Sequence, residues 1–439
     1  MQAYRSWFQV FSTEHLEFLF YQKTKGNPAV GTDWVTTSVF EKRLSSEVEV
    51  ILRKCNNRTY HFSRYCEKLI SKGAAKPPWC ISIPTTRDKL TLCALNEVIV
   101  DVYGNAATTP MPQAIINALR EALSTHQFDS FIKIDISSFY ASIDHEILIK
   151  KLRRKIRKAE VLHLISSAIK TQTIKPNAMV VPEERLVGIP EGLSISNSLA
   201  NIFMQSIDSK YCAKSNSMYW RYVDDIILLC NHDRIEQAKT EFVRDLSYIG
   251  LSVNTEKAKT GEIKEGFEYL GYYIDSNKVS VRKSSIVTIE RTLEAIFRSY
   301  SKAEKPNIEY LVWKINLKIT GFILNNNKYG WVFFYSQITD LSCLAHLDWL
   351  IRTLCKRYGV DKAGFKSFLR SYHEITKSLH TTRYIPNLDT ITLEEKRHIV
   401  QEIYGEAKKN DDDAIIEQKF RHIMRKEIHN IQKDVQSFS

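Results

Sequence analysis

Short apolar runs mark the predicted strands of this chain. Residues 131–136 place single polar side chains among isoleucines, and signals of a turn and a helix follow them. Residues 219–230 contain two apolar runs on either side of Asp224 and Asp225, which predicts a β-hairpin with both aspartates at its turn. The aromatic run at 266–274 predicts one more strand.

Helical spacing of apolar positions dominates the rest of the chain. Residues 34–75 predict helices, and residues 79–104 begin as a short strand and become helical after Pro84. A long helix is expected across 150–169, and from about residue 281 the pattern is mainly helical. The final helix carries its apolar residues on one face: Ile416, Phe420, Ile423, Ile428, Ile431 and Val435. This mixture indicates an α/β (α+β) fold.

Length, charge and cysteine usage narrow the class of protein. The chain has 439 residues, which predicts two or three units, and a formal charge of +12. A basic excess favours a polyanionic partner, because Lys and Arg neutralise phosphates and release counterions. The eight cysteines show no CxxC pair and no zinc spacing, which argues against a thiolate metal site. Neither a signal peptide nor a membrane span is recognisable, so we expect a soluble, cytoplasmic protein with no membrane partner.

Two adjacent aspartates inside an apolar run need an explanation, because like charges repel and burial raises the cost of each. One interpretation is a turn in solvent, where aspartate is common. The other is a cation held between strands. Asp135, near the end of the strand at 131–136, supplies a third carboxylate, and three acids on neighbouring strand ends are destabilising unless cations offset them. Two divalent ions about 3.5–4 Å apart do so in phosphoryl transfer, with Mg²⁺ preferred and Mn²⁺ as a substitute.

Five short segments, taken in order, resemble motifs A to E of the reverse transcriptase palm. They are IDISSFY (134–140), GIPEGLSISNSLAN (188–201), YVDD (222–225), GLSVNTEKAKT (250–260) and FEYLGYYI (267–274). Upstream, GTDWVTTSVFEKRL (31–44) and ISIPTTRDKLTLCAL (81–95) resemble the fingers of bacterial reverse transcriptases of the group II intron, retron and phage-defence types. The resemblance covers about residues 30–275 and is greatest to the phage-defence-associated enzymes.

The resemblance implies a right-hand polymerase with fingers, palm and helical thumb. Fingers are expected at 1–120, and a palm with an antiparallel sheet at 121–280, of which 150–187 belongs partly to the fingers. A helical thumb and C-terminal extension are expected at 281–439. The implied activity is that of an RNA-directed DNA polymerase, a nucleotidyltransferase that adds dNTPs to a primer by two-metal phosphoryl transfer.

The family's catalytic roles fall on the acidic residues already identified. The resemblance implies that Asp135, Asp224 and Asp225 are the catalytic triad and bind two Mg²⁺ ions. The backbone carbonyl of Ile136 is implied as a further metal ligand. These four residues form the predicted metal site.

Three further positions are implied to contact the nucleotide or the primer. Tyr140 falls where a bulky ring excludes a ribose 2′-OH, although a tyrosine in the core is the alternative. Tyr222 is implied to lie beside the primer terminus. Lys257 or Lys259 corresponds to the motif D lysine, a general acid for the departing pyrophosphate, and each is an ordinary surface lysine on the alternative interpretation.

The chain departs from the family pattern around the triphosphate. Glu191 stands where glutamine is common, and its charge repels a triphosphate. Gly192 allows the backbone to approach a nucleotide closely. In the fingers, Trp79 stands about where an arginine is expected, so Lys76 and Arg87 are the best remaining triphosphate contacts.

A basic run at 150–158 packs seven cations into nine residues. These residues cannot all lie on one face of a helix, so some are solvated whatever the function. Proximity to motif A favours contact with template or structured RNA. The RNA-binding candidates are Lys151, Arg153, Arg154, Arg157 and Lys158.

The C-terminal third loosely resembles the thumb of group II intron-type enzymes. Such a thumb lies on a primer–template duplex, where four basic residues are candidates for phosphate contacts: Lys314, Lys318, Lys328 and Arg352. The neighbouring aromatic residues are predicted to be core rather than a stacking platform: Trp331, Phe333, Phe334 and Tyr335.

The expected partners are a structured noncoding RNA template, a DNA primer and product, and dNTPs, with homo-oligomerisation left open. The favoured role is reverse transcription in bacterial antiviral defence. A retron or group II intron-type enzyme is the alternative within the family. An RNA-binding maturase or scaffold without synthesis is the alternative from another class, and untemplated or protein-primed synthesis is a further one.

Overall fold

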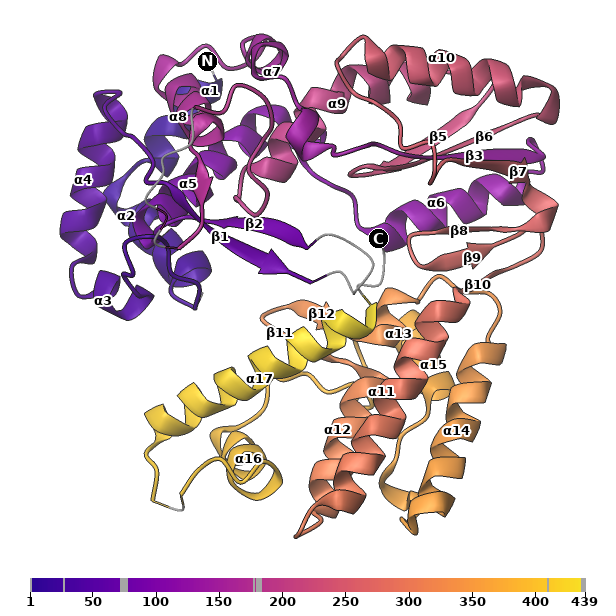
Figure 1. Cartoon of the computed structure of the whole chain (residues 1–439). Coiled ribbons are helices and arrows are strands. Elements are labelled where there is room, and N and C mark those ends of the chain that lie inside the picture. Colours follow the sequence, from indigo (N-terminus) through magenta and orange to yellow (C-terminus); the bar gives the residue numbers. More distant parts are fainter. Residues whose placement is uncertain are drawn as a thin grey trace. The chain divides into compact units, whose positions relative to one another are not determined.

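The structure is a computed structural model that describes residues 2–26, 28–71, 78–176, 178, 184–408 and 410–435. The chain divides into two compact units, drawn in Figure 1. Unit 1 comprises Met1–Pro110 and Ser130–Gly261, and unit 2 comprises Met111–Asp129 and Glu262–Ser439. The predicted mixture of helices and sheets is confirmed. The finer division into fingers, palm and thumb stays a prediction.

Unit 1 contains two sheets and the helices that cover them. Its helices are α1 (Gln2–Val10), α2 (Thr13–Leu19), α3 (Thr37–Glu41), α4 (Leu44–Asn56), α5 (Thr86–Tyr103), α7 (His145–Leu152), α8 (Ala159–Lys170), α9 (Ser196–Cys212) and α10 (Ile235–Ser247). One sheet has the order β2-β1-β4, from β1 (Tyr65–Ile70), β2 (Trp79–Ile83) and β4 (Thr173–Ile174). The other has the order β5-β6-β3-β7, from β3 (Ser130–Asp135), β5 (Met218–Tyr222), β6 (Asp225–Cys230) and β7 (Lys259–Glu262).

The four-stranded sheet positions the acidic residues. β6 lies in the middle and pairs antiparallel with both β5 and β3. The apolar residues that predicted these strands, such as Ile132, Ile134 and Ile226, are fully buried. The predicted strand and hairpin are therefore confirmed. Figure 1 shows α10 lying over this sheet, within unit 1.

Two predicted elements of unit 1 have different boundaries in the structure. Residues 34–75 are not all helical: α4 ends at Asn56, and 65–70 form β1, which pairs antiparallel with β2. Strand pairing overrides the local pattern there. The single helix predicted at 150–169 is also wrong, because the chain turns between α7 and α8. Ile156 and Lys158 are both buried within that break, whereas a continuous helix would place them on opposite faces.

Unit 2 is mainly helical, as predicted for the chain beyond residue 281. Its helices are α6 (Pro112–Ser124), α11 (Lys283–Lys302), α12 (Ile308–Thr320), α13 (Trp331–Phe334), α14 (Ser342–Tyr358), α15 (Phe368–Lys377), α16 (Leu393–His398) and α17 (Asp413–Val435). Its strands are β8 (Phe267–Tyr269), β9 (Tyr272–Ile274), β10 (Val279–Val281), β11 (Phe322–Leu324) and β12 (Asn327–Tyr329). The strand predicted at 266–274 is a hairpin, because Leu270 and Gly271 take positive φ angles of 48° and 83°.

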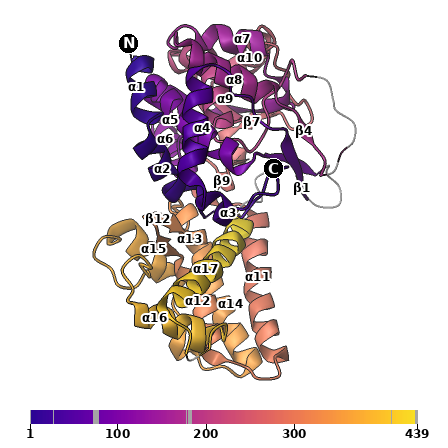
Figure 2. The same ribbon diagram turned by 90° about the vertical axis from the view of Figure 1, so that its left-hand side faces the viewer.

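The core of unit 2 lies between its long helices. Trp331, Phe333 and Tyr335 are buried, which confirms them as core residues, whereas Phe334 is half-buried. The apolar face of the last helix is also confirmed, since Ile416 and Ile423 are buried on α17. Figure 2 shows α17 running beside α12. No helix in the described part of the chain is long and apolar enough to cross a membrane.

Candidate active site

The three predicted catalytic aspartates lie at one edge of the four-stranded sheet. Asp135 is the last residue of β3, and it pairs in the antiparallel register with Asp225, the first residue of β6. Asp224 lies in the turn before β6, where its carbonyl oxygen accepts a 3.1 Å hydrogen bond from the backbone N–H of Ile136. The strand pairing thus brings together carboxylates that are far apart in the sequence.

The carboxylates at this edge are only partly compensated. Desolvation raises the pKa of Asp225 to about 6, with smaller contributions in the same direction from Asp224 and Asp135. Lys133 opposes this shift, with its Nζ 3.4 Å from Asp225 Oδ2. Lys257 Nζ lies 3.2 Å from Asp135 Oδ2. Two ammonium groups therefore supply positive charge beside the two facing carboxylates.

The donor set at this edge suits a hard divalent cation. Three carboxylates and the carbonyl of Ile136 offer the oxygen ligands that Mg²⁺ prefers. In the described part of the chain, no three His, Cys, Asp or Glu side chains are gathered closely enough to hold a metal ion as they stand. A cation binding here would compete with Lys133 and Lys257 for Asp225 and Asp135.

The sequence does not distinguish Lys257 from Lys259 as the motif D lysine, but their surroundings in the structure differ. Lys257 contacts Asp135 through the 3.2 Å ion pair. Lys259 begins β7 and is exposed. Lys257 is therefore the one of the two that lies with the triad.

Lys133 was missed by sequence reasoning, although a signal existed. It lies two positions before Asp135 in an otherwise apolar strand, so both side chains lie on the same face of β3. Arg221, in β5, was also missed. Its guanidinium contacts the turn that carries Asp224, but nothing in the sequence around a single strand arginine indicates that contact.

The two tyrosines implied to contact nucleotide or primer share the electrostatic environment of the triad. Tyr140 is half-buried, and its hydroxyl donates to Asn197 of α9. Burial raises its pKa first, followed by the charges of Asp224 and Glu191. Burial and then Asp224 likewise raise the pKa of Tyr222, at the end of β5. Both rings therefore lie near Asp224.

The two departures from the family pattern contact each other. The indole N–H of Trp79 donates to the carboxylate of Glu191, and the N–H of Ser82 donates to the carbonyl of Glu191 at 2.8 Å. Gly192 takes a φ of 96°, and a Cβ there would lie 2.5 Å from the Cγ2 atom of Ile81. The glycine therefore lets the motif B loop approach strand β2 of the protein.

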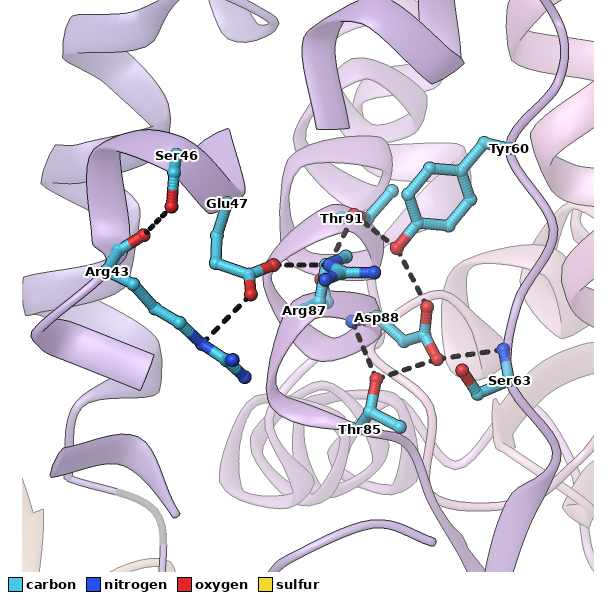
Figure 3. A network of polar contacts seen from close by, with 9 residues as sticks. All are labelled: Arg43, Ser46, Glu47, Tyr60, Ser63, Thr85, Arg87, Asp88 and Thr91. Carbon is cyan, nitrogen blue, oxygen red and sulfur yellow. Dashed lines mark hydrogen bonds and ion pairs between the residues drawn. The ribbon is translucent and has the colours of Figure 1, made fainter. Parts of the chain in front are cut away.

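The two predicted triphosphate contacts have different outcomes. Lys76 lies outside the described residues. Arg87, at the start of α5, is held by Glu47, which is 5% exposed and also accepts from Arg43 at 3.1 Å (Figure 3). The Nε atom of Arg87 forms this ion pair, which leaves its terminal nitrogen atoms for the predicted triphosphate contact.

A buried carboxylate beside Arg87 fixes the start of α5. Asp88 is 2% exposed and accepts from the hydroxyl of Tyr60 at 2.7 Å, the backbone N–H of Ser63 at 3.0 Å and the hydroxyl of Thr85 at 2.8 Å (Figure 3). Thr85 is the N-cap of α5. This network holds the helix that carries Arg87.

Two cations of the basic run turn inward. Lys158 is 5% exposed, and its Nζ lies 4.8–5.3 Å from the ring centroids of Tyr4, Trp7 and Phe8. Lys151 donates to the carbonyl of Phe203, and burial lowers its pKa to about 8. These contacts oppose the RNA-binding role predicted for both lysines. The remaining RNA-binding candidates are exposed: Arg153, Arg154 and Arg157.

Two lysines of unit 2 that were predicted to contact phosphate form ion pairs instead, one of them buried (Lys318) and one half-buried (Lys314). Lys318 Nζ lies 2.5 Å from Asp434 of α17, and Lys314 Nζ lies 2.5 Å from Glu427 of the same helix. The prediction for these two residues is wrong, because their charges are already neutralised inside unit 2.

Residues 70–274 match the family described as "Reverse transcriptase (RNA-dependent DNA polymerase)". Among curated relatives, "Protein YkfC" of Escherichia coli (strain K12) is 22% identical over 354 residues, covering 69% of this chain and 88% of that protein. "Group II intron-encoded protein LtrA" of Lactococcus lactis subsp. cremoris is 22% identical over 202 residues, covering 44% of this chain and 32% of that protein. The chain thus spans most of the first relative and about a third of the second.

Solved structures with a similar trace include two from yeast. "Structure of telomerase from Candida albicans in complexe with TWJ fragment of telomeric RNA" has a TM-score of 0.43 at 13% identity, covering 91% of this chain and 68% of that one. "Structure of apo telomerase from Candida Tropicalis truncated from C-terminal domain" has a TM-score of 0.41 at 15% identity, covering 56% of this chain and 61% of that one.

Proposed function

We propose that this chain, whose residues 70–274 match the reverse transcriptase family, is an RNA-directed DNA polymerase that extends a primer with dNTPs. The observation that carries the proposal is the pairing of Asp135 with Asp225 at a sheet edge, with Asp224 in the adjoining turn. These three carboxylates and the carbonyl of Ile136 are the groups that would hold two Mg²⁺ ions. When bound, such ions stabilise the attacking and leaving oxygens of an in-line displacement.

The residues around the triad suit the remaining tasks of nucleotide addition. Lys257, whose Nζ lies 3.2 Å from Asp135 Oδ2, is the proposed proton donor to the departing pyrophosphate. Tyr222 lies at the end of β5, near Asp224, where it would contact the primer terminus. The terminal nitrogen atoms of Arg87 are the proposed contact with the triphosphate.

The experiment that tests the activity is primer extension on an RNA template with Mg²⁺ and dNTPs. Replacing Asp224 and Asp225 together by alanine should lower incorporation at least about a thousandfold, because several kcal/mol of transition-state stabilisation would be lost. The matched control is Asp233→Ala, a nearby exposed aspartate in the short 3-10 helix His232–Arg234, which should retain activity. Equal incorporation by the double variant and the wild type would overturn the proposal.

Tyr140 is proposed to select deoxyribonucleotides. Its ring is held by the bond from its hydroxyl to Asn197, so it cannot easily turn away from a 2′-OH. Tyr140→Ala should raise ribonucleotide use relative to deoxyribonucleotide use, measured in competition assays with paired dNTP and rNTP. Tyr140→Phe keeps the ring but loses this bond, so it should show a selectivity between those of the wild type and the alanine variant. An unchanged ratio for the alanine variant would assign Tyr140 to packing.

The polyanionic partner is proposed to be a structured noncoding RNA that supplies the template. The exposed residues Arg153, Arg154 and Arg157 are the proposed phosphate contacts. Their joint replacement by alanine should reduce the slope of log affinity against log salt by about 2, at about 0.7 per single-strand contact. A control removes three exposed charges of α17: Arg421, Arg425 and Lys426. Equal slopes for the two triple variants would overturn this assignment.

A role in antiviral defence is the proposed biological setting. It is supported by the sequence resemblance alone, which is greatest to the phage-defence-associated enzymes. Sequencing the RNA and DNA that co-purify with the protein, with and without phage infection, tests this setting. Co-purified nucleic acid from a self-spliced intron would instead favour the intron-type alternative.

A further inference from the structure

The turn that presents the catalytic aspartates has a strained backbone. Val223, between Tyr222 and Asp224, takes a φ of 57°, in the left-handed region. A β-branched residue rarely occupies that region, because its side chain crowds the backbone there. Such a conformation is unfavourable and persists only where the surroundings impose it. The directions in which Asp224 and Asp225 leave the turn depend on this angle.

The guanidinium of Arg221 contacts the strained peptide directly. One terminal nitrogen, Nη1, donates to the carbonyl of Val223 at 2.9 Å. Nε and the other terminal nitrogen form two parallel bonds to the carboxylate of Asp208, at 2.9 and 2.6 Å. The arginine side chain is 8% exposed. The fork geometry of a guanidinium thus fixes the carbonyl of the turn relative to Asp208.

The other side of this contact is helix α9, which begins directly after the motif B loop. Asp208 and Asn201 lie two helical turns apart and therefore on one face of α9. Asn201 accepts from Arg221 Nη1 at 3.2 Å, and Asp208 also accepts from Tyr219 at 2.7 Å. The guanidinium of Arg221 thus ties the turn to the helix that follows the motif B loop.

We propose that Arg221 is a positioning residue for the triad: it holds the Val223 carbonyl against α9 and so keeps the strained turn that aims Asp224 and Asp225. The role in the reaction rests on the proposed function. The role in shaping the acidic edge is independent of the proposed function, because metal binding can be measured without any DNA synthesis. The competing explanation is that Arg221 only neutralises Asp208 and packs β5 on α9.

A four-variant cycle separates these explanations: wild type, Arg221→Lys, Val223→Gly and the double variant. Lysine keeps the charge beside Asp208 but cannot form the fork. Glycine takes a positive φ without steric cost, so it removes the need for a restraint. Binding of Mn²⁺ alone is measured by the electron paramagnetic resonance signal of the free ion, and primer extension gives kcat and the KM for dNTP. Thermal unfolding by circular dichroism shows that each variant folds.

In the valine background, Arg221→Lys should weaken Mn²⁺ binding and lower kcat by about tenfold each, the factor for a strain of about 1.4 kcal/mol. In the glycine background, the same substitution should change both quantities by less than about threefold. Asp208→Asn, which leaves one poor acceptor for the fork, should show the same dependence on residue 223. Val223→Ala should not rescue, since alanine retains a Cβ.

Two results would overturn the inference. One is an Arg221→Lys variant that binds Mn²⁺ and synthesises DNA like the wild type. The other is an equal defect in the valine and glycine backgrounds, which would make Arg221 a packing residue of β5 and α9. If the wild type binds Mn²⁺ but synthesises nothing, the proposed function fails, and the Mn²⁺ cycle still decides the role of Arg221.

Discussion

Two aspartates, the buried Asp434 in unit 2 and the half-buried Asp225 in unit 1, are compensated very differently. Asp434 of α17 is 4% exposed, with Lys318 Nζ at 2.5 Å and the Thr292 hydroxyl at 2.7 Å. Asp225, at the sheet edge of unit 1, has its nearest lysine, Lys133, at 3.4 Å, and desolvation raises its pKa to about 6. The first carboxylate is neutralised by the fold itself. The second keeps a cost that a bound cation would remove.

The contacts of a buried or half-buried acid therefore distinguish a structural acid from a functional one. A buried ion pair with short contacts on both partners holds two elements together, as Lys318 and Asp434 do for α12 and α17. An acid beside two other acids, with lysines at longer range, stores unfavourable energy in the free protein. That pattern is expected where a ligand carries the missing positive charge. We therefore predict that removing the charge lowers the stability of the protein at Asp434 and raises it at Asp225.

The largest expected effect is on unit 2. Asp434→Asn should lower the free energy of unfolding by about 3–5 kcal/mol, because Lys318 would remain buried without its counterion. Hydrogen exchange measured on peptides from α12 and α17, together with urea unfolding, checks this. Replacing both partners, as Lys318→Met with Asp434→Leu, should recover most of the loss. An Asp434→Asn variant as stable as the wild type would show that the ion pair with Lys318 does not stabilise unit 2.

The same two regions show which features a sequence can predict. The strand ending in Asp135 and the hairpin around Asp224 and Asp225 follow from local alternation and from a turn signal, so they were predicted. That these strands lie together at their acidic ends follows from no local pattern: it was an interpretation of three neighbouring acids, which the family resemblance then implied as well. The buried state of Lys318 was not predicted, because its partner lies on α17 and no local pattern indicates a pairing across that separation.

Other errors have equally physical causes. The helix predicted at 150–169 is broken, because Lys158 is drawn against three aromatic rings of α1. The strain at Val223 and its restraint by Arg221 depend on a backbone angle that composition does not report. Tertiary contacts decide all of these, and a single sequence contains no record of them.

The next effect is a change in stability with pH in unit 1. The pKa of Asp225 is about 6 in the folded chain against an ordinary value of 3.8. Its contribution to stability is therefore fully present below about pH 3.8 and is lost as the pH rises through about 6. In EDTA, Asp225→Asn should stabilise the chain at pH 7–8 by up to about 3 kcal/mol, and the gain should vanish near pH 4.

Thermal unfolding of both proteins across pH 4–8 provides the measurement. Asp434→Asn is the matched control and should be destabilised at pH 7, so the two aspartate-to-asparagine changes should have opposite signs. A destabilised Asp225→Asn variant at pH 8 would mean that Lys133 compensates this carboxylate fully. Asp225, like Asp434, would then be an acid that the fold itself neutralises.

The smallest effect concerns Glu191, an acid held by a neutral donor. Its carboxylate accepts from the indole N–H of Trp79, and its charge acts on Tyr140, close to Asp224. Glu191→Gln keeps an acceptor oxygen for Trp79 and removes the negative charge. A triphosphate nearby should then be repelled less, and the KM for dNTP should fall about fivefold, for a Coulomb energy of about 1 kcal/mol.

Trp79→Phe separates the charge from the hydrogen bond. It keeps a ring but removes the donor, so in the glutamate background the carboxylate is less well held and the KM for dNTP should rise. In the glutamine background the same change should matter less, because no charge is released. Steady-state kinetics on one primer–template at two salt concentrations would show the charge effect shrinking with salt. A Glu191→Gln variant whose KM rises would show instead that the carboxylate itself binds the nucleotide, which would place Glu191 with Asp225 among the functional acids.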